Sequence, residues 1–272
     1  RFMSQESRKN RVLEKMRNGE VVLCTNSTPI CSPKIAELIG LIGFDCLWID
    51  MEHQDFSYDE VFNACLACRA TGMEPLVRIR REGRHSCARG FEVGGTGIMV
   101  PHCMGAEDAR EIVRNARFWP VGLRGLDGVE ALAQYGLMDT RQYMEWSNRE
   151  TFVMVQIEDR EAVEEVDGIA AVDGIDILLV GPGDLGQSYG CPGQFNHPKI
   201  RVAIERVSEA AEKHGRYWGI PCSTPDNARA MIRLGARFIN AGSLIGVVQK
   251  GFLDIYREYT PVCADKLGDS SS

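Results

Sequence analysis

One stretch of the sequence shows the pattern that decides the fold: SPKIAELIGLIGFDCLWIDMEH, at residues 32–53. Ser32 is suited to cap a helix, the following apolar residues have helical spacing, and Gly43 is typical of the position just beyond a helix C-terminus. The apolar run that follows, FDCLWID, predicts a strand buried on both faces, as in a parallel sheet. The stretch therefore predicts a helix that leads through glycine into a buried strand, and this strand ends in acidic and imidazole side chains.

The same pattern recurs along the chain. Helical segments with apolar residues three to four positions apart separate eight short apolar runs. These runs predict strands at 21–27, 44–50, 75–80, 96–103, 151–158, 175–181, 216–223 and 237–242. Eight strand–helix units favour an α/β fold of the (β/α)8 type, a single-domain TIM barrel over residues 1–265. A doubly wound open sheet is the alternative, with less support because the sequence has neither GxGxxG after the first strand nor GxxxxGK[ST].

Three segments depart from this repeat. Residues 1–20 are polar and basic and predict an exposed N-terminal helix. Residues 119–150 separate the fourth and fifth strands by far more than one helix requires, and long loops in compact domains are usually functional. The tail at 266–272 is predicted to be disordered.

The composition indicates a globular cytoplasmic protein. The 272 residues are 44% hydrophobic and carry a net charge of −7, which counts against a nucleic-acid-binding surface. The chain has no apolar stretch near the roughly 20 residues that a membrane helix needs. Ten cysteines lie mostly in apolar segments and predict reduced, structural thiols. The CxxC pair, Cys65 and Cys68, falls in a helical pattern and has no second pair to complete a zinc site.

The polar residues that follow the predicted strands are the candidates for function, because chemistry in such barrels lies at the carboxyl ends of the strands. From the second strand to the eighth, these ends carry Asp50, Glu52 and His53; Arg78 and Arg80; Pro101 and His102; Gln156 and Glu158; Asp184; Pro221 and Cys222; and Gly242 and Ser243.

Two of these carboxylates belong to successive strands, Glu158 and Asp184. Carboxylates with room for water and substrate oxygens suit Mg²⁺ or Mn²⁺, which prefer oxygen ligands. Asp184 also lies beside glycines that let a ligand approach the backbone closely. Helix capping is the alternative for both acids, since each precedes a helical segment.

Basic and imidazole side chains at the same strand ends have two interpretations each. Arg78 lies in a strand expected to be buried and needs a partner, either an acid of a neighbouring strand or the carboxylate or enolate of a substrate. His53 is a surface residue or an acid/base catalyst. The cluster of Arg80, Arg81 and Arg84 indicates either a solvated face or a site for a phosphate or a second carboxylate.

Five segments of the sequence resemble a known family, the HpcH/HpaI aldolases, which are class II pyruvate aldolases. They are IDMEH (49–53), PLVRI (75–79), PVGLRG (120–125), VQIED (155–159) and GPGDLGQSYG (181–190). They occur in order over nearly the whole chain. The resemblance implies a retro-aldol and aldol reaction on pyruvate or a related 2-oxo acid with an aldehyde. It also implies a divalent metal ion (Mg²⁺, Mn²⁺ or Co²⁺) and no organic cofactor.

The resemblance also implies roles for individual residues. The family's metal carboxylates match Glu158 and Asp184, and its arginine that holds the keto or enolate oxygen matches Arg78. Its histidine, which moves protons with a bound water, matches His53, with Asp50 beside it. The chemistry is consistent, because a cation and an arginine stabilise the enolate formed when the C–C bond breaks.

Further residues complete the expected substrate site. The backbone amides of Gly183 and Asp184 match those that receive the substrate carboxylate, and Gln156 matches an active-site amide. Pro221 is also assigned to substrate binding. One position departs from the family pattern: where an aspartate partners the histidine in other members, this chain has Glu92.

Alternatives to the aldolase remain open at this point. The same metal-bound enolate can serve oxaloacetate decarboxylation or another condensation, and the barrel can bind a 2-oxo acid without turnover. Family members are homo-oligomers, often hexamers, whose last helix is exchanged between subunits. The segment at 243–259 has apolar residues on more than one face, which fits a helix buried in a partner.

Overall fold

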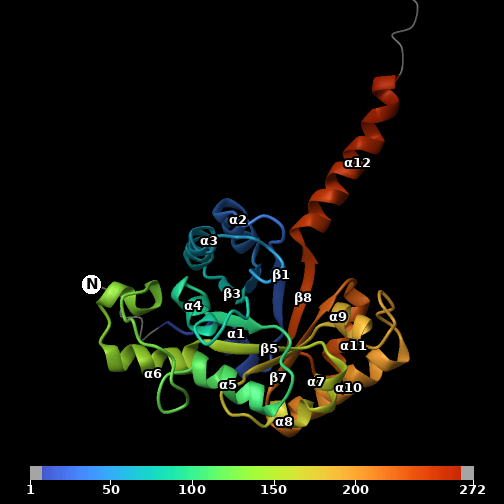
Figure 1. The fold of residues 1–272 in the computed structure, drawn as a ribbon. Helices are drawn as coiled ribbons and strands as arrows, with labels where there is room; N and C mark the ends of the chain where they lie inside the picture. Colours follow the sequence, from blue (N-terminus) through green and yellow to red (C-terminus); the bar gives the residue numbers. More distant parts are fainter. Residues whose placement is uncertain (1–7, 265–272) are drawn as a thin grey trace, which may run out of the picture.

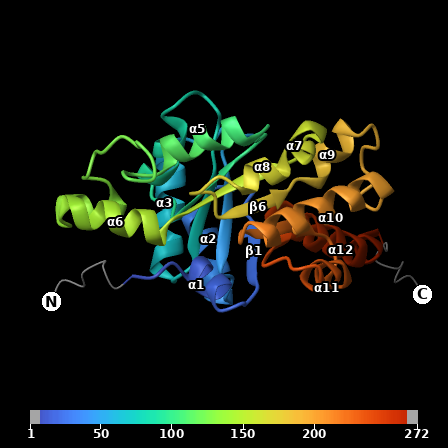
Figure 2. The ribbon, with the colours of Figure 1, turned by 90° about the horizontal axis from the view of Figure 1, so that it is seen from below.

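The structure, a computed structural model, describes residues 8–264 as a closed barrel of eight parallel strands (Figures 1 and 2). Each strand pairs with the next in the chain, and the last pairs with the first. The strands are β1 (Val22–Asn26), β2 (Cys46–Asp50), β3 (Glu74–Arg78), β4 (Gly97–Val100), β5 (Phe152–Ile157), β6 (Ile177–Val180), β7 (Tyr217–Cys222) and β8 (Phe238–Ser243). All eight predicted strands and the TIM-barrel fold are confirmed.

Helices surround the barrel, as the apolar stripes predicted (Figure 2). They are α1 (Arg11–Arg17), α2 (Pro33–Ile42), α3 (Tyr58–Ala70), α4 (Ser86–Glu92), α5 (Ala106–Ala116), the 3-10 helix η2 (Ala131–Gly136), α6 (Thr140–Glu150), α7 (Arg160–Glu164), α8 (Val166–Ala170), α9 (Pro182–Ser188), α10 (Pro198–Lys213), α11 (Pro225–Arg233) and α12 (Leu244–Ala264). No helix within 8–264 is long and apolar enough to cross a membrane.

The ends of the helices follow their local sequence. Gly43 has a φ of 113°, the left-handed conformation that favours glycine, and it ends α2 as expected. Ser32 occupies the N-cap position of that helix, but its side chain makes no capping hydrogen bond. In α3, by contrast, Ser57 and Glu60 form a reciprocal capping box.

The N-terminal helix was predicted to be exposed, and this prediction is wrong. Val12, Leu13 and Met16 of α1 are buried and belong to the same apolar cluster as side chains inside the barrel. The basic residues that suggested exposure instead pair with an acid at the amino ends of the strands. Lys15 Nζ lies 2.7 Å from Asp45 Oδ2. Helix α1 therefore closes the amino end of the barrel.

The long connection at 119–150 contains η2 and α6 and lies on the flank of the barrel (Figure 1). Its anchor is Arg124, whose side chain is 1% exposed and lies between the rings of Phe91 and Phe118. Arg124 also pairs with Glu130 and donates a hydrogen bond to the hydroxyl of Tyr143. This buried ion pair and its aromatic neighbours hold the connection against α4 and α5.

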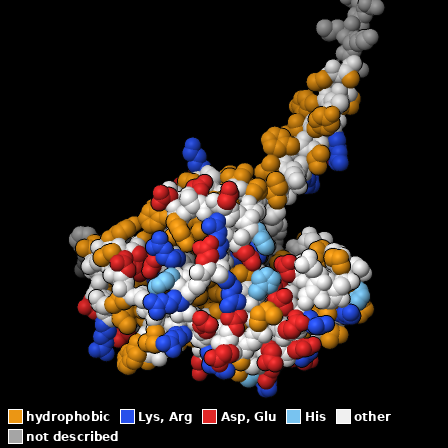
Figure 3. Space-filling view, viewed as in Figure 1, with side chains coloured by type: hydrophobic (Ala, Val, Ile, Leu, Met, Phe, Trp, Pro, Cys, Tyr) orange, Lys and Arg blue, Asp and Glu red, His pale blue; other side chains and the backbone are white. Residues whose placement is uncertain are grey.

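The last helix, α12, projects away from the barrel (Figure 1). None of its residues is buried, and its exposed side chains include Phe252, Ile255, Tyr256 and Tyr259. Figure 3 shows hydrophobic side chains along this projecting arm. The predicted disordered tail at 266–272 lies outside the described residues.

Candidate active site

The site is built at the carboxyl ends of the strands around Arg78. Asp50 and Arg78 are direct register partners on β2 and β3. Because side chains two residues apart share a strand face, they lie on the same inner face as Trp48, which belongs to the cluster inside the barrel. Arg78 Nε and Nη2 donate to the two oxygens of Asp50 at 2.9 and 2.6 Å. This bidentate pair confirms the interpretation of Arg78 as the partner of an acid on a neighbouring strand.

The pair with Asp50 does not use the whole guanidinium group. Arg78 Nη1 lies 2.9 Å from Glu52 Oε2, but this contact is not aligned as a hydrogen bond. The same nitrogen donates to Gln156 Oε1 at 3.5 Å. The Arg78 side chain is only 8% exposed, and its guanidinium carbon lies 4.8 Å from the centre of the Trp48 ring. Arg78 is therefore held in one orientation at the barrel mouth.

Gln156 connects this arginine to the next carboxylate. Its side-chain nitrogen donates to Glu158 Oε2 at 2.8 Å, while its side-chain oxygen accepts from Arg78. The other oxygen of Glu158 accepts from the backbone N–H of His102 at 2.9 Å. Glu158 thus accepts hydrogen bonds from β5 and from the end of β4, not from helix α7. This geometry contradicts the capping alternative for Glu158.

Glu158 is the most perturbed acid of the site. Burial raises its pKa to about 7, and the charges of Glu52 and Asp184 act in the same direction. Its position requires Gly181, because a Cβ at residue 181 would lie 2.4 Å from Glu158 Oε2. Asp184 lies in the first turn of α9 and is half-buried. Burial and the charges of Glu52 and Asp184 all disfavour the ionised carboxylate of Glu158, and a nearby cation would favour it.

His102 is a site residue for which the sequence suggested no particular role. Its Nδ1 lies 2.8 Å from Asp159 Oδ2, and its Nε2 lies 3.7 Å from Glu52 Oε1. Burial alone would lower the pKa of His102, but the hydrogen bond to Asp159 and the charges of Glu158, Asp159 and Glu52 outweigh it and raise the pKa. Its φ of 50° is a left-handed conformation that costs about 1–3 kcal/mol in a residue other than glycine. The signal in the sequence was the position of His102 after β4.

The two residues expected to form a catalytic dyad are not brought together. His53 is 59% exposed, and its Nε2 lies 3.8 Å from Glu52 Oε2. Its backbone N–H donates to Asp50 Oδ1 at 3.3 Å, which fixes the loop beside the site. Glu92, at the end of α4, instead pairs with Arg89 at 3.1 Å, and its carboxylate makes no ion pair with His53 in the described part of the chain.

A large cavity adjoins the site on the side of β7 and β8. Its volume is about 930 Å³, and its lining includes Pro182, Pro221, Cys222 and Asn240. Asn240 Oδ1 is buried and has no hydrogen-bond partner among the described residues. Pro221 therefore lines a space next to the strand ends, and its role in substrate binding stays a prediction. Gly183 lies on the exposed side of α9.

Comparison with known proteins bears directly on this site. The model of the HpcH/HpaI aldolase/citrate lyase family matches residues 28–249. The chain belongs to this family. A curated relative, the 5-keto-4-deoxy-D-glucarate aldolase of Enterobacter sp. (strain 638), is 33% identical over 218 residues, which cover 80% of this chain and 84% of that protein.

Solved structures of HpcH/HpaI proteins share the fold. An HpcH/HpaI aldolase from Desulfitobacterium hafniense DCB-2 has a TM-score of 0.85 and 27% identity, and the match covers 95% of this chain and 98% of that one. The citrate synthase SbnG has a TM-score of 0.84 and 25% identity, and the match covers 93% and 98%. The resemblance drawn from the five motifs is confirmed, as is the enzyme class, a carbon–carbon lyase of the aldolase type.

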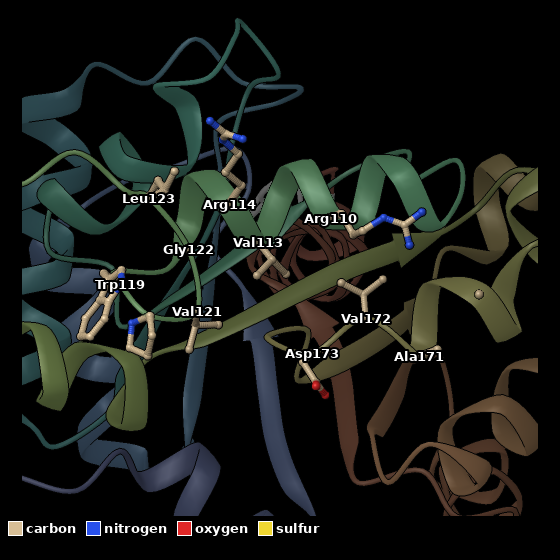
Figure 4. Close-up of a pocket in the computed structure, with 12 residues that line it drawn as sticks. Arg110, Val113, Arg114, Trp119, Val121, Gly122, Leu123, Ala171, Val172 and Asp173 are labelled. Atoms are coloured by element: carbon tan, nitrogen blue, oxygen red, sulfur yellow. The ribbon is translucent and has the colours of Figure 1, made fainter.

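One HpcH/HpaI motif lies outside the mouth of the barrel. Residues 120–125, PVGLRG, follow α5 on the flank, where the first four of them line a groove of about 520 Å³ (Figure 4). Gly122 packs so closely that a Cβ there would lie 2.5 Å from the carbonyl oxygens of Val113 and Arg117. The groove contains none of the strand-end residues discussed above. In this chain the motif therefore serves packing of the long connection.

Proposed function

We propose that this protein is a metal-dependent class II aldolase that forms or cleaves a C–C bond between the enolate of pyruvate, or a similar 2-oxo acid, and an aldehyde. Its substrates would be 2-keto-3-deoxy or 4-hydroxy-2-oxo acids. The observation that carries the proposal is the buried Glu158, held beside Arg78 by Gln156 and close enough to Asp184 for the two charges to interact.

The donor set fits a divalent ion. Arg78 pairs with the carboxylates of Asp50 and Glu52, and Glu158 interacts with the like charges of Glu52 and Asp184. With His102 beside Glu52 and Glu158, two basic side chains serve these four acids. Glu52 Oε2 is buried and accepts no aligned hydrogen bond from the described residues, although it lies 2.9 Å from Arg78 Nη1. Within 8–264 no three His, Cys, Asp or Glu residues are grouped as a ready-made metal cage. Mg²⁺ and Mn²⁺ suit such a site because they keep water and substrate oxygens as ligands.

In this proposal Glu158 and Asp184 hold the metal ion. The ion, Mg²⁺, Mn²⁺ or Co²⁺, would supply a Lewis acid that polarises the keto group and stabilises enolate charge. Arg78 would donate to the same substrate oxygen through Nη1, because Nε and Nη2 are bound to Asp50 while Nη1 makes only a 3.5 Å hydrogen bond to Gln156 and an unaligned contact with Glu52. The fixed guanidinium costs little reorganisation during the reaction, which is how preorganised charges lower a barrier.

The substrate carboxylate and the reacting proton require further groups. The backbone amides of Gly183 and Asp184, in the first turn of α9, would receive the carboxylate, where the helix N-terminus favours an anion. Pro221 would contact the apolar part of the substrate from β7. His53, working through a bound water, would take the proton of the C4 hydroxyl, and its exposure leaves room for that water. Asp50 would hold the His53 backbone in place.

The proposal is tested by screening the release of pyruvate from hydroxy-keto acids with Mg²⁺, Mn²⁺ or Co²⁺, and again after treatment with EDTA. We expect activity that disappears with EDTA and returns with the ion. Activity that survives thorough metal removal would overturn the metal-dependent mechanism.

A second reaction on the same site is favoured by the structural match to a citrate synthase. Oxaloacetate decarboxylation, or condensation of the enolate with another electrophile, would use the same metal ion and Arg78. Assays of oxaloacetate decarboxylation beside pyruvate release distinguish these reactions. A barrel that only binds a 2-oxo acid would bind pyruvate with no turnover of any of these substrates.

The oligomeric state follows from α12. Its exposed Phe252, Ile255 and Tyr256 form an apolar surface that nothing in the described chain covers. Helix α11, which lines part of the 930 Å³ cavity, likewise has no buried residue. We propose that α12 packs on a second copy in a homo-oligomer, a hexamer or smaller. Light scattering of the full chain and of a Phe252→Ser/Tyr256→Ser variant tests this, because a monomeric wild type would contradict it.

All ten cysteines of the sequence lie in the described range, and all are free. Free thiols of this number suit a reducing compartment, so we propose a cytoplasmic location. Fractionation of cells that express the tagged chain tests this location.

A further inference from the structure

We propose that Arg80 and Arg81 are positioning residues that fix the two loops flanking the active site. They follow β3 directly and bind the loops of the two neighbouring strands, one on each side. Their effect on turnover rests on the proposed function, whereas their effect on the loops does not. Neither of the roles considered from the sequence, a solvated face or a phosphate site, describes these contacts.

Arg80 holds the loop after β2. Its Nε donates to the carbonyl oxygen of Met51 at 2.6 Å, and its Nη2 donates to that of Gln54 at 2.7 Å. The residues between these two carbonyls are Glu52 and His53. Their backbone N–H groups donate to Asp50 Oδ1, so the loop is bound through its carbonyls on one side and its amides on the other. One guanidinium group thus spans the segment that carries both side chains.

Arg81 holds the loop after β4 in the same manner. Its Nη1 donates to the carbonyl oxygen of His102 at 2.7 Å and to that of Pro101 at 3.4 Å. Asp108 orients it through a bidentate ion pair and also accepts from the N–H of Met104 at 3.0 Å. His102, whose backbone is left-handed, is therefore held at both its peptide groups: its carbonyl oxygen accepts from Arg81, and its N–H donates to Glu158.

The two loops meet at the mouth of the barrel. Glu52, on the loop held by Arg80, lies 3.7 Å from the His102 ring, on the loop held by Arg81. The spacing between these side chains therefore depends on two adjacent residues of one strand end. Reactions that need aligned groups are sensitive to such spacing, since a displacement of about 1 Å can cost about 10²-fold in rate.

The test compares Arg80→Met and Arg81→Met, which keep the side-chain length and remove the donors, with Arg84→Met as the matched control. Arg84 belongs to the same run but contacts His85 at the surface. Hydrogen exchange of the full chain is the first measurement. We expect faster exchange at residues 51–54 in Arg80→Met alone, faster exchange at 101–104 in Arg81→Met alone, and no change in Arg84→Met.

Turnover is the second measurement, made on the metal-loaded enzyme. We expect kcat to fall about 10- to 100-fold in the Arg80 and Arg81 variants while KM changes little, because the loops would be misplaced without loss of a substrate contact. Arg80→Lys should recover part of the loss, since an ammonium can reach one carbonyl at a time. Arg84→Met should match the wild type.

The possible failures are distinguishable. Unchanged exchange at both loops would overturn the positioning role, whatever the activity. A loss of kcat equally large in Arg84→Met would also overturn it, because it would indicate a general effect of surface charge. A rise in KM alone, with normal exchange, would mean that these arginines bind substrate. A wild type without aldolase activity would refute the proposed function, and the exchange result would still decide the positioning role.

Discussion

At the amino ends of the strands each buried acid has its own cation, whereas at the carboxyl ends several acids share one arginine. Asp45 accepts from the N–H of Leu23 at 2.9 Å and pairs with Lys15 at 2.7 Å. Glu74 pairs with Arg8 and accepts from the backbone N–H of Arg11 in α1 and from the hydroxyl of Thr96. In each case a carboxylate at the start of a strand is satisfied by the backbone, by helix α1 or by both.

Two further acids at the amino end follow the same rule. Glu150 accepts from the N–H of Asn10 at 3.0 Å and pairs with Arg17 at 3.5 Å. Asp176 accepts from the N–H of Val153 and pairs with Arg117. Balanced charges of this kind leave no place for a ligand.

The carboxyl end is different because its acids exceed its cations. Arg78 is shared by Asp50 and Glu52, and Glu158 interacts with the like charges of Glu52 and Asp184. The contacts at the amino end stabilise the fold, whereas in the proposed function the carboxyl end binds a cation and a substrate. Substitutions at the two ends should therefore separate activity from stability.

The largest effect is expected for Glu158→Gln. It removes the charge of a proposed metal ligand and should cost several kcal/mol of transition-state stabilisation, a loss of about 10³-fold in kcat/KM. Titration with Mn²⁺ should show weaker binding. Both oxygens of Glu158 accept hydrogen bonds, from the His102 N–H and from the Gln156 side chain, and the new amide nitrogen would face one of these donors, so the metal-free variant should lose about 1–3 kcal/mol of stability. Normal activity with normal Mn²⁺ binding would contradict the metal site.

Arg78→Lys is expected to have the next largest effect. Lysine keeps the positive charge but cannot bind Asp50 with two parallel hydrogen bonds and also reach a substrate oxygen. We expect kcat to fall about 10²- to 10³-fold, as when one donor to a developing oxyanion is lost. Circular dichroism should show a retained fold. Unchanged turnover would mean that the enolate assignment is wrong.

A pair of histidine variants compares the two loops at the carboxyl end. His53→Ala should lower kcat about 10²-fold or more, the usual contribution of acid/base catalysis. His102→Ala should have a smaller effect, because its contacts are to protein acids. A larger loss in His102→Ala than in His53→Ala would move the proton-transfer role to the imidazole held by Asp159.

The pH dependence of metal binding is a smaller and graded effect. Burial raises the pKa of Glu158 to about 7, so the carboxylate is protonated below that pH and free to bind a cation above it. The apparent Mn²⁺ affinity should therefore rise as the pH increases through about 7, by about tenfold per pH unit below it if one proton is displaced. Calorimetry between pH 5.5 and 8 measures this. A flat profile would contradict the raised pKa.

The smallest effect on activity is expected at the opposite end. Asp45→Asn removes the negative charge that pairs with Lys15 and accepts from the N–H of Leu23. It should reduce the free energy of unfolding by about 1–3 kcal/mol. The kcat of the folded enzyme should not change. Denaturant unfolding and steady-state kinetics on the same sample check both statements. A large loss of kcat would show that the two ends are coupled.

Much of the fold could be predicted because strands and helices are local features. The run 44–50 is apolar throughout, and β2 is buried at every position. The pairing of Asp50 with Arg78 also follows from position, since residues in register on adjacent parallel strands lie side by side. Helix α1 was misjudged because an amphipathic helix can face solvent or close a barrel, and only the arrangement of the whole chain decides which; residues 1–7 lie outside the described range.

The sequence by itself determined the barrel, the family and the group of strand-end residues, because these depend on residue type and spacing. The tertiary structure alone decided how the loops between them are held. Arg80 and Arg81 bind backbone carbonyls, which every residue carries and which leave no mark in the sequence. The placement of His102 beside Asp159 depends likewise on two loops that are 57 residues apart in the chain.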